Sequence, residues 1–365
     1  MAIIVALVII GGINRIGNVT GYLAPIMALA YVLCASIIII SNLNKIPDSF
    51  NLIISMAFNP PATIAGTGGG ILMTMLWGIK RGLYSNEAGQ GSAPIAHAAA
   101  RTHEPADEGM VSILEPFIDT IVICTITGLV ILSSGVWMEK FGNEFQRADT
   151  NFVSGTYTES ESADTEQLFL YLNGDDSVVN GYSGSIFVQN GLAQNNSDFT
   201  LIHARSFAEN VMFSDGQGPI SGSINVSDGA LDDASIIVSG DSLLHSVPLT
   251  TRAFTRGLFG DYGQYIVSIG LMLFAFSTAI AWSYYGDRAM TYLFGTKSVF
   301  PYRVVYVLGF FYAALADTTI VWNISLITIV LMTVPNLVGI LLMHKEMKRT
   351  VADYWDRTEH RNRDT

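Results

Sequence analysis

Long apolar runs separated by short polar segments dominate the chain, and they predict helices that cross a membrane. A hydrocarbon core about 30 Å thick needs roughly 20 apolar helical residues. Residues 23–41, 110–138, 265–285 and 319–343 form such runs, and the shorter run at 304–315 spans only with help from its flanks. The pattern therefore predicts an α-helical integral membrane protein.

Another apolar stretch, residues 62–79, has the length of a span but is interrupted by glycine. The interruption reads Gly66, Thr67, Gly68, Gly69, Gly70. Backbone groups in hydrocarbon must be satisfied, so one interpretation is a helix that unwinds here and offers N–H and C=O groups to a carboxylate, an amino group or a cation. The other interpretation is that the glycines let helices pack closely.

The first apolar run, residues 2–13, is too short to span a bilayer at about 1.5 Å per residue. A signal peptide needs a basic segment and a small-residue cleavage site, and neither is found here. We expect the chain to begin within a helix.

The negative charge is concentrated in the middle of the chain. Residues 139–256 contain 16 Asp and Glu against 5 Lys and Arg, whereas the remainder contains 15 against 14. Runs of β-forming residues at 185–189, 199–203, 223–227 and 235–239 are separated by Gly, Asn and Asp. We interpret residues 139–262 as an acidic, β-rich domain; the alternative is a disordered acidic loop.

The charges of the loops predict an orientation. If the tail, residues 346–365, is cytoplasmic, the basic residues outside 139–262 lie on the cytoplasmic side except Lys45. This is the asymmetry that the positive-inside rule describes, and it places residues 139–262 outside the cytoplasm.

Few residues suggest chemistry of their own. Asp119 lies within an apolar run, where a carboxylate is a candidate for coupling or gating; the alternative is a structural hydrogen bond from a neighbouring helix. Both cysteines lie in apolar runs, the histidines lack metal-ligand spacing, and no nucleophile–base pair or phosphate loop occurs. Neither an enzyme nor a nucleic-acid-binding protein is indicated.

Four motifs, in order, resemble the sodium:alanine/glycine symporter family. The most distinctive is Arg-Gly-Leu-Tyr-Ser-Asn-Glu-Ala-Gly-Gln-Gly-Ser-Ala-Pro at 81–94. The others are Gly-Gly-Ile-Asn-Arg-Ile at 11–16, Phe-Ile-Asp-Thr-Ile-Val-Ile-Cys-Thr at 117–125, and Phe-Ala-Phe-Ser-Thr at 274–278 followed by Trp-Ser-Tyr-Tyr-Gly at 282–286. The resemblance covers about 1–138 and 263–345 and omits the acidic segment.

The resemblance implies a LeuT-like fold of two inverted five-helix repeats, which the chain contains only in part. Core helices four to seven would fall in residues 1–138 and helices eight to ten in 263–345, while helices one to three would be missing. It also implies a plasma-membrane symporter that couples Na⁺ to a small neutral amino acid such as alanine or glycine.

Roles for particular residues follow from the same resemblance. The run Gly66–Gly70 would face the amino acid in the sixth core helix, and Ser277 and Thr278 would ligate Na⁺ in the eighth; the alternative for this pair is hydrogen bonding to the preceding turn. Trp282 would wall the substrate pocket or, alternatively, belong to an interfacial aromatic belt. Asn86 and Glu87 would act in gating, with Glu87 paired to a residue such as Arg81.

A second function from another class stays open at this point. The chain could be a non-transporting scaffold that displays an extracytoplasmic binding or adhesion domain to an unknown external partner. The implied missing helices and the acidic segment motivate this alternative.

Overall fold

The computed structural model describes residues 2–58, 78, 79, 82, 84–87, 89–172, 179–194, 198–316 and 318–363. The chain divides into two compact units, each described by itself. Unit 1 contains Met1–Ser36, Gly78–Thr127 and Tyr265–Thr365, and unit 2 contains Ile37–Trp77 and Gly128–Gln264. The glycine run at 66–70 lies outside the described residues.

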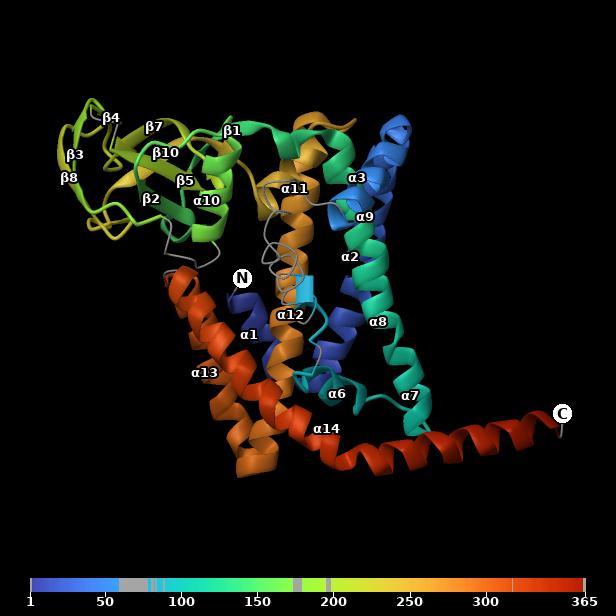
Figure 1. Ribbon diagram of the computed structural model, residues 1–365. Helices are drawn as coiled ribbons and strands as arrows, with labels where there is room; N and C mark the ends of the chain where they lie inside the picture. Colours follow the sequence, from blue (N-terminus) through green and yellow to red (C-terminus); the bar gives the residue numbers. More distant parts are fainter. Residues whose placement is uncertain are drawn as a thin grey trace. The chain divides into compact units, whose positions relative to one another are not determined.

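Helices form at every predicted apolar run that falls in the described part of the chain (Figure 1). The helices that carry these runs, with their near neighbours, are α1 (Ala2–Ile10), α2 (Gly12–Ser41), α3 (Ile46–Phe58), α6 (Ser92–His97), α7 (Pro105–Ser112), α8 (Leu114–Pro116), the π-helix η2 (Phe117–Ile123), α9 (Cys124–Ser134), α12 (Gly263–Phe294), α13 (Val299–Ala313) and α14 (Thr318–Arg363). The 3-10 helices are η1 (Leu43–Lys45), η3 (Val136–Met138), η4 (Arg147–Asp149), η5 (Gly260–Tyr262) and η6 (Thr296–Ser298).

In the described part of the chain, four helical segments are long and apolar enough to cross a membrane. They are Arg15–Ser41, Pro105–Ser134, Gly260–Phe294 and Ile324–Thr358. Helix α13 has 15 residues, which at about 1.5 Å each falls short of the hydrocarbon thickness. The four segments correspond to the four long apolar runs of the sequence.

Apolar side chains of α14 face outward rather than into a protein core. Ile327, Leu331 and Leu341 are 62%, 68% and 70% exposed. A soluble protein seldom leaves so many large apolar side chains uncovered, whereas lipid tails cover them without cost. The exposure pattern therefore agrees with a helix surrounded by lipid.

The packing of unit 1 joins the beginning of the chain to α12 and α13. Val5 and Ile9 of α1 are fully buried in one cluster with Ile280 of α12. Beside this cluster, Arg303 of α13 donates to both carboxylate oxygens of Asp287, with its Nη2 2.6 Å from Oδ2. Asp287 is almost completely buried, so this ion pair compensates a charge that would otherwise be costly to bury.

Unit 2 contains antiparallel strands between residues 140 and 243. They are β1 (Lys140–Glu144), β2 (Thr150–Ser154), β3 (Gly184–Gln189), β4 (Leu192–Ala193), β5 (Phe199–His203), β6 (Ser206–Phe207), β7 (Glu209–Ser214), β8 (Gly222–Ser227), β9 (Ala230–Leu231) and β10 (Ile237–Leu243). They form three sheets in the orders β1-β10-β7, β2-β5-β6 and β4-β3-β8-β9. Strands β3, β5, β8 and β10 coincide with, or overlap, the four β-forming runs of the sequence.

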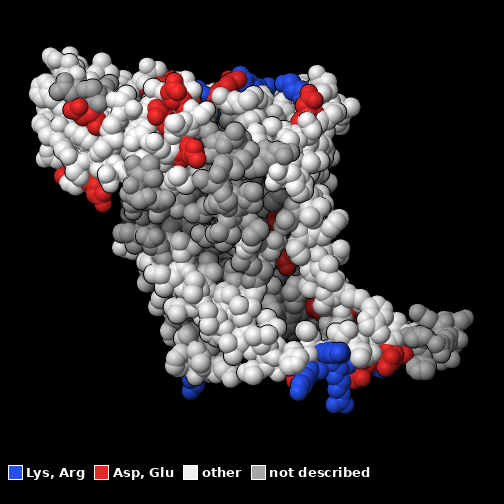
Figure 2. Space-filling view, viewed as in Figure 1, with Lys and Arg blue, Asp and Glu red and all other residues white. Residues whose placement is uncertain are grey.

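A hydrophobic core holds these sheets together. Phe152, Phe213 and Val188 lie in it with 1% or less of their surface exposed. Two helices that the sequence analysis did not predict, α10 (Ser162–Leu172) and α11 (Ser246–Thr255), accompany the strands. Leu168 of α10 is buried against Val153 and Ile202, so this helix covers a separate small cluster. Figure 2 shows Asp and Glu side chains over the surface of these strands.

A buried histidine at the end of β5 contacts β10. His203 is 4% exposed; its ring stacks on Phe145 at 4.2 Å, and its Nδ1 lies 2.7 Å from Ser242 Oγ. Burial and, to a smaller extent, the nearby His245 lower the pKa of His203 to about 4, and Asp149 opposes the shift. The folded protein thus keeps this imidazole neutral under conditions in which an exposed histidine is protonated.

We predict that unit 2 loses stability below neutral pH because of this histidine. Below the ordinary histidine pKa of about 6.5, His203 is protonated in the unfolded chain but stays neutral in the folded chain. The free energy of unfolding therefore falls with decreasing pH until about pH 4. The shift corresponds to an upper limit of roughly 3 kcal/mol.

Calorimetry of the detergent-purified chain at about pH 7 and pH 5 measures this effect. The variant His203→Leu should lose most of the pH dependence whatever its stability at neutral pH. An unchanged dependence in this variant would assign the effect to other groups.

Candidate functional site

The motif at 81–94 is attached to η2 through two neighbouring side chains. Ser85 Oγ donates to Asp119 Oδ2 at 3.0 Å, and Thr120 Oγ1 donates to Asn86 Oδ1 at 2.7 Å. Asp119, the carboxylate within the apolar run, therefore has a hydrogen-bond donor from the motif. Its partner is the serine directly before Asn86.

Glu87 connects the same motif to α12. Its Oε1 accepts a hydrogen bond from Trp282 Nε1 at 3.1 Å, and its Oε2 accepts one from Ser92 Oγ. The backbone of Glu87 has a φ of 50°, an uncommon conformation for a residue other than glycine. Arg81, the expected ionic partner, lies outside the described residues. The two hydrogen bonds hold the carboxylate beside the indole.

Two glycines of the motif allow α14 to approach it. Gly89 and Gly91 have φ values of 77° and 82°, and Asn336 Nδ2 of α14 donates to the Gly89 carbonyl at 2.9 Å. A Cβ at Gly91 would lie 2.9 Å from Asn336 Oδ1. The glycines thus provide both the left-handed backbone and the space for the asparagine.

These contacts surround a cavity of about 930 Å³ within unit 1. The described residues that line it come from the motif, from η2 and α9, from α12 and from α14. They are Gly78, Gly82, Tyr84, Ser85, Glu87, Gln90, Thr120, Cys124, Thr278, Trp282, Ser325, Thr328, Ile329 and Met332. Both hydroxyl groups and apolar side chains contribute to its wall. Among these described lining residues Glu87 is the carboxylate, and none is Lys, Arg or His.

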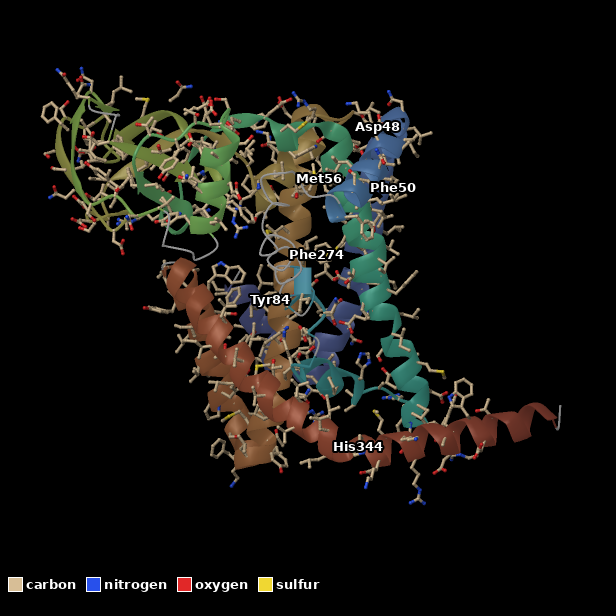
Figure 3. The ribbon with its side chains drawn as sticks, viewed as in Figure 1. Asp48, Phe50, Met56, Tyr84, Phe274 and His344 are labelled. Atoms are coloured by element: carbon tan, nitrogen blue, oxygen red, sulfur yellow. The ribbon has the colours of Figure 1, made fainter. Side chains whose placement is uncertain are left out.

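The α12 residues of interest differ in their surroundings. Thr278 and Trp282 both line the cavity, because residues four apart lie on one face of a helix. Ser277 Oγ instead donates to the Phe274 carbonyl at 2.8 Å, the bond that the back-bonding alternative predicts. Figure 3 labels Phe274, and also Tyr84, whose ring centre lies 5.9 Å from that of Trp322.

Several lining residues were missed by the sequence analysis. Ser325, Thr328 and Met332 of α14 are spaced three and four apart, so they share one helix face that carries two hydroxyls within an apolar span. That spacing was a usable signal. Thr120 and Cys124 follow Asp119 closely, but η2 is a π-helix, whose turns a 3.6-residue pattern does not reproduce.

A histidine and two glutamates connect the short helices next to the cavity. His97 Nδ1 lies 2.7 Å from Glu108 Oε1, and His97 Nε2 lies 3.6 Å from Glu115 Oε2. The three side chains belong to α6, α7 and α8. In the described part of the chain no group of His, Cys, Asp and Glu has a geometry suited to a metal ion.

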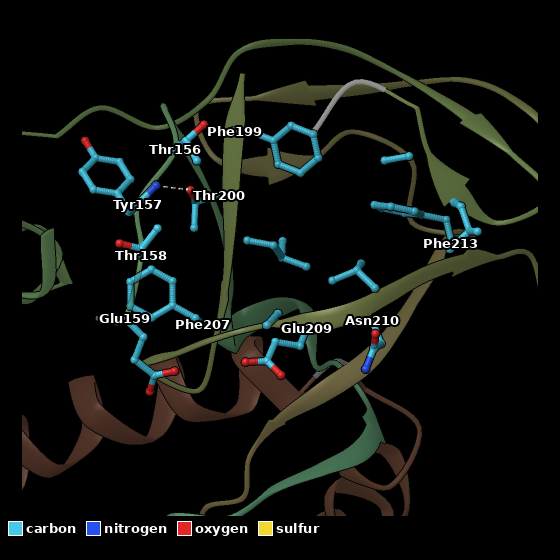
Figure 4. A pocket seen from close by; sticks show the side chains of 15 residues that line it. Thr156, Tyr157, Thr158, Glu159, Phe199, Thr200, Phe207, Glu209, Asn210 and Phe213 are labelled. Atoms are coloured by element: carbon cyan, nitrogen blue, oxygen red, sulfur yellow. Dashed lines mark hydrogen bonds between the residues drawn. The ribbon is translucent and has the colours of Figure 1, made fainter. Parts of the chain in front are cut away.

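A second cavity, of about 580 Å³, lies within unit 2 (Figure 4). Tyr157, Phe199 and Phe207 line it, and the Tyr157 N–H donates to Thr200 Oγ1 at 2.9 Å. Glu159 and Glu209, also in its lining, each contact Lys140 Nζ at 2.6 Å. One lysine thus neutralises part of the charge of both carboxylates.

The membrane-length helices and the partly polar cavity in unit 1 are features of an integral membrane transporter. Residues 1–160 and 232–365 match the profile of the sodium:alanine symporter family. The chain belongs to this family. The match extends further into the acidic segment than the motifs indicated and leaves 161–231, which contain α10 and β3 to β9, unmatched.

Curated relatives of this chain are named as symporters, carriers or transporters. The sodium/alanine symporter AgcS of Methanococcus maripaludis is 33% identical over 94% of this chain and 53% of its own length. The sodium/proton-dependent alanine carrier protein of Bacillus sp. strain PS3 is 26% identical over 95% and 58%, and a transporter of Haemophilus influenzae is 28% identical over 98% and 56%. The chain spans about half the length of these relatives.

We predict that the Glu87–Trp282 hydrogen bond stabilises unit 1. Glu87→Ala leaves the indole N–H without its acceptor, and Trp282→Phe removes the donor. A hydrogen bond to a charged group contributes about 1.5–3 kcal/mol, so each single change should lower the melting temperature measurably.

Thermal unfolding of the two single variants and the double variant in detergent measures the coupling. The double variant should lose less than the sum of the single losses. Trp322→Phe is a matched control, because it should combine additively with Glu87→Ala. Additive losses for both tryptophans would mean that the Glu87–Trp282 bond contributes nothing.

Proposed function

We propose that the protein containing this chain is a secondary transporter that couples Na⁺ to the uptake of a small neutral amino acid, alanine or glycine. The observation that carries the proposal is the cavity shared by Glu87, Thr278 and Trp282, three residues from family-like motifs that are distant in sequence. Two relatives, a sodium/alanine symporter and a sodium/proton-dependent alanine carrier, support this choice of ion and substrate by their names.

Thr278 and Ser277 are our candidates for Na⁺ ligands. Hydroxyl oxygens suit a hard cation, and neutral ligands avoid placing a net negative charge in the membrane. Thr278 lines the cavity directly. Ser277 donates its proton to the Phe274 carbonyl, which leaves the lone pairs of its oxygen free to accept a cation.

The amino acid would bind beside this ion. In our proposal the backbone of Gly66, Thr67, Gly68, Gly69 and Gly70 recognises its charged groups, and Trp282 limits the size of its side chain. The bond from Trp282 to Glu87 supports the second role, because it restrains the indole ring on the cavity wall. An indole fixed in this way excludes larger side chains by contact.

Asn86, Glu87 and Asp119 are proposed gating residues for alternating access. Each forms a hydrogen bond to a different helix or to the motif, so helix movements that open one side of the site must break these bonds. Bistable contacts of this type separate discrete states of a transporter. We propose that the full-length protein has the LeuT-like inverted repeats, with core helices four to ten in this chain.

We predict that loss of the Thr278 hydroxyl weakens Na⁺ binding in the full-length protein. Thr278→Val keeps the shape of the side chain but removes its oxygen, leaving the ion under-coordinated, and should raise the Na⁺ concentration for half-maximal alanine uptake about tenfold or more. The coupling free energy between two binding sites is the same in both directions, so the affinity for alanine should fall too.

Uptake into proteoliposomes at varied Na⁺ concentration measures this effect. Thr278→Ser, which keeps the oxygen, is the matched control, and Ser277→Ala tests the second ligand. If Thr278→Val has an unchanged Na⁺ dependence, Thr278 is not a ligand.

We also predict that residues 139–262 are extracytoplasmic and that the C-terminal tail lies on the cytoplasmic side of the plasma membrane. Single cysteines at the exposed Ala234 and Asp356 report on this, with Cys34 and Cys124 replaced by alanine. A membrane-impermeant thiol reagent should label only position 234 in intact cells and both positions after permeabilisation. Labelling of position 356 in intact cells would reverse the orientation.

A further inference from the structure

The last part of α14 continues well beyond a membrane span. The helix has 46 residues, which at about 1.5 Å per residue gives roughly 70 Å, more than twice the thickness of the hydrocarbon core. Charged residues become frequent from Lys345 onward. Figure 1 shows that α14 changes direction along its length, and Figure 3 labels His344 near this change. We call residues 344–358 the tail helix.

Contacts within unit 1 hold the tail helix against the beginning of another span. Arg357 donates to both carboxylate oxygens of Glu104, at 2.8 and 3.0 Å, and Tyr354 donates to Asp107 at 2.7 Å. Glu104 directly precedes, and Asp107 lies in, the first turn of the span Pro105–Ser134. The tail helix therefore starts where the apolar run at 319–343 ends, and it meets the end of a second span about ten residues later.

This placement defines the direction of the tail helix. A helix that continued straight out of the membrane would be some 15 Å away from the surface after ten residues. The contacts with Glu104 and Asp107 instead keep it near the end of the span that begins there. The contacts therefore direct the tail helix across the end of that span rather than straight away from it.

One side of the tail helix is apolar and uncovered. Met347, Val351 and Trp355 are four residues apart, so they form one stripe, and they are 59%, 43% and 56% exposed. At about 100° per residue, Glu346, Asp353 and Asp356 fall on the opposite side. The acidic residues thus point away from the stripe.

Two lysines lie to one side of the stripe: at about 100° per residue, Lys348 is about 60° from Val351 around the helix and Lys345 is about 120° from it. Lys345 and Lys348 are three residues apart, and Lys348 is three residues before Val351. Lysine can bury its aliphatic stem against an apolar surface while its ammonium group reaches headgroups, and tryptophan favours the interface between water and lipid. Figure 2 shows Lys and Arg side chains gathered on this part of the chain.

We propose that the tail helix is an interfacial helix that inserts its Met347–Val351–Trp355 stripe among the lipid headgroups and binds anionic headgroups through Lys345 and Lys348. The membrane is the occupant that fits the stripe, because the stripe continues from a lipid-facing span and the acidic side faces water. An amphipathic helix of this pattern gains affinity from both apolar burial and charge.

Spin labels on the full chain test this proposal. Single cysteines at Val351, Trp355, Asp353 and Asp356, with Cys34 and Cys124 replaced by alanine, are labelled and reconstituted in phosphatidylglycerol or phosphatidylcholine vesicles. Labels at 351 and 355 should collide with oxygen and be protected from a water-soluble nickel chelate, and labels at 353 and 356 should show the reverse. Equal access of the chelate to all four positions would place the helix in water.

Protection of positions 351 and 355 from both reagents would also overturn the proposal, because it would mean that protein, from a second copy or another partner, covers the stripe.

The charge requirement has its own matched control. Lys345→Gln with Lys348→Gln should increase access of the chelate to a label at 351 several-fold in phosphatidylglycerol and change it little in phosphatidylcholine. Arg349→Gln, which alters a basic residue on the side with Asp353, should leave the access unchanged. If the lysine double variant and Arg349→Gln change the access of the chelate equally, Lys345 and Lys348 do not bind anionic headgroups.

Discussion

The absence of water in the hydrocarbon core is the constraint on which the rest of unit 1 depends. Polar groups placed there must find partners within the protein. The side chains of Ser85, Asn86 and Glu87 find theirs on η2, on α12 and within the motif itself. A segment that contributes three consecutive hydrogen-bonding side chains can hold helices together without apolar packing between them. The polar motif therefore determines which helix faces surround the cavity.

Sequence patterns predicted the spans well because hydrocarbon length and backbone satisfaction leave few options. The run at 319–343 predicted the apolar part of α14 but not its continuation to Arg363, since the long apolar run, which was the signal, ends at Met343; in the structure Arg357 of the continuation binds Glu104. Strands β3, β5 and β8 were visible from their β-branched and aromatic runs. Helix α10 was not, because most of its apolar residues are consecutive at its C-terminal end rather than spaced three and four apart; in the structure Leu168 is buried with Val153.

The site was predictable only where a motif carried it. The sequence singled out Glu87, Thr278 and Trp282, and all three line one cavity. Thr120, Ser325 and Thr328 went unnoticed, because single hydroxyls in apolar helices are common and become informative only when several face one space. The glycine run at 66–70 lies outside the described residues, so its part in the site stays a prediction. The family profile leaves residues 161–231 unmatched, which separates much of unit 2 from the part of the chain that matches the family.

The π-helix at Phe117–Ile123 makes the span Pro105–Ser134 a helix of two offset halves. Within it the Cys124 N–H bonds to the Asp119 carbonyl five residues earlier, one residue more than in an α-helix. That extra residue offsets the faces of the two halves by about 100° relative to a continuous α-helix. Deleting one residue here would restore a regular helix and shorten the span by less than about 2 Å along its axis. It would also rotate one half of the span relative to the other. Either Asp119 and Thr120, or the residues after Cys124, would then no longer face the helices that they contact. A change that makes the local backbone more regular would therefore disrupt the packing of the span.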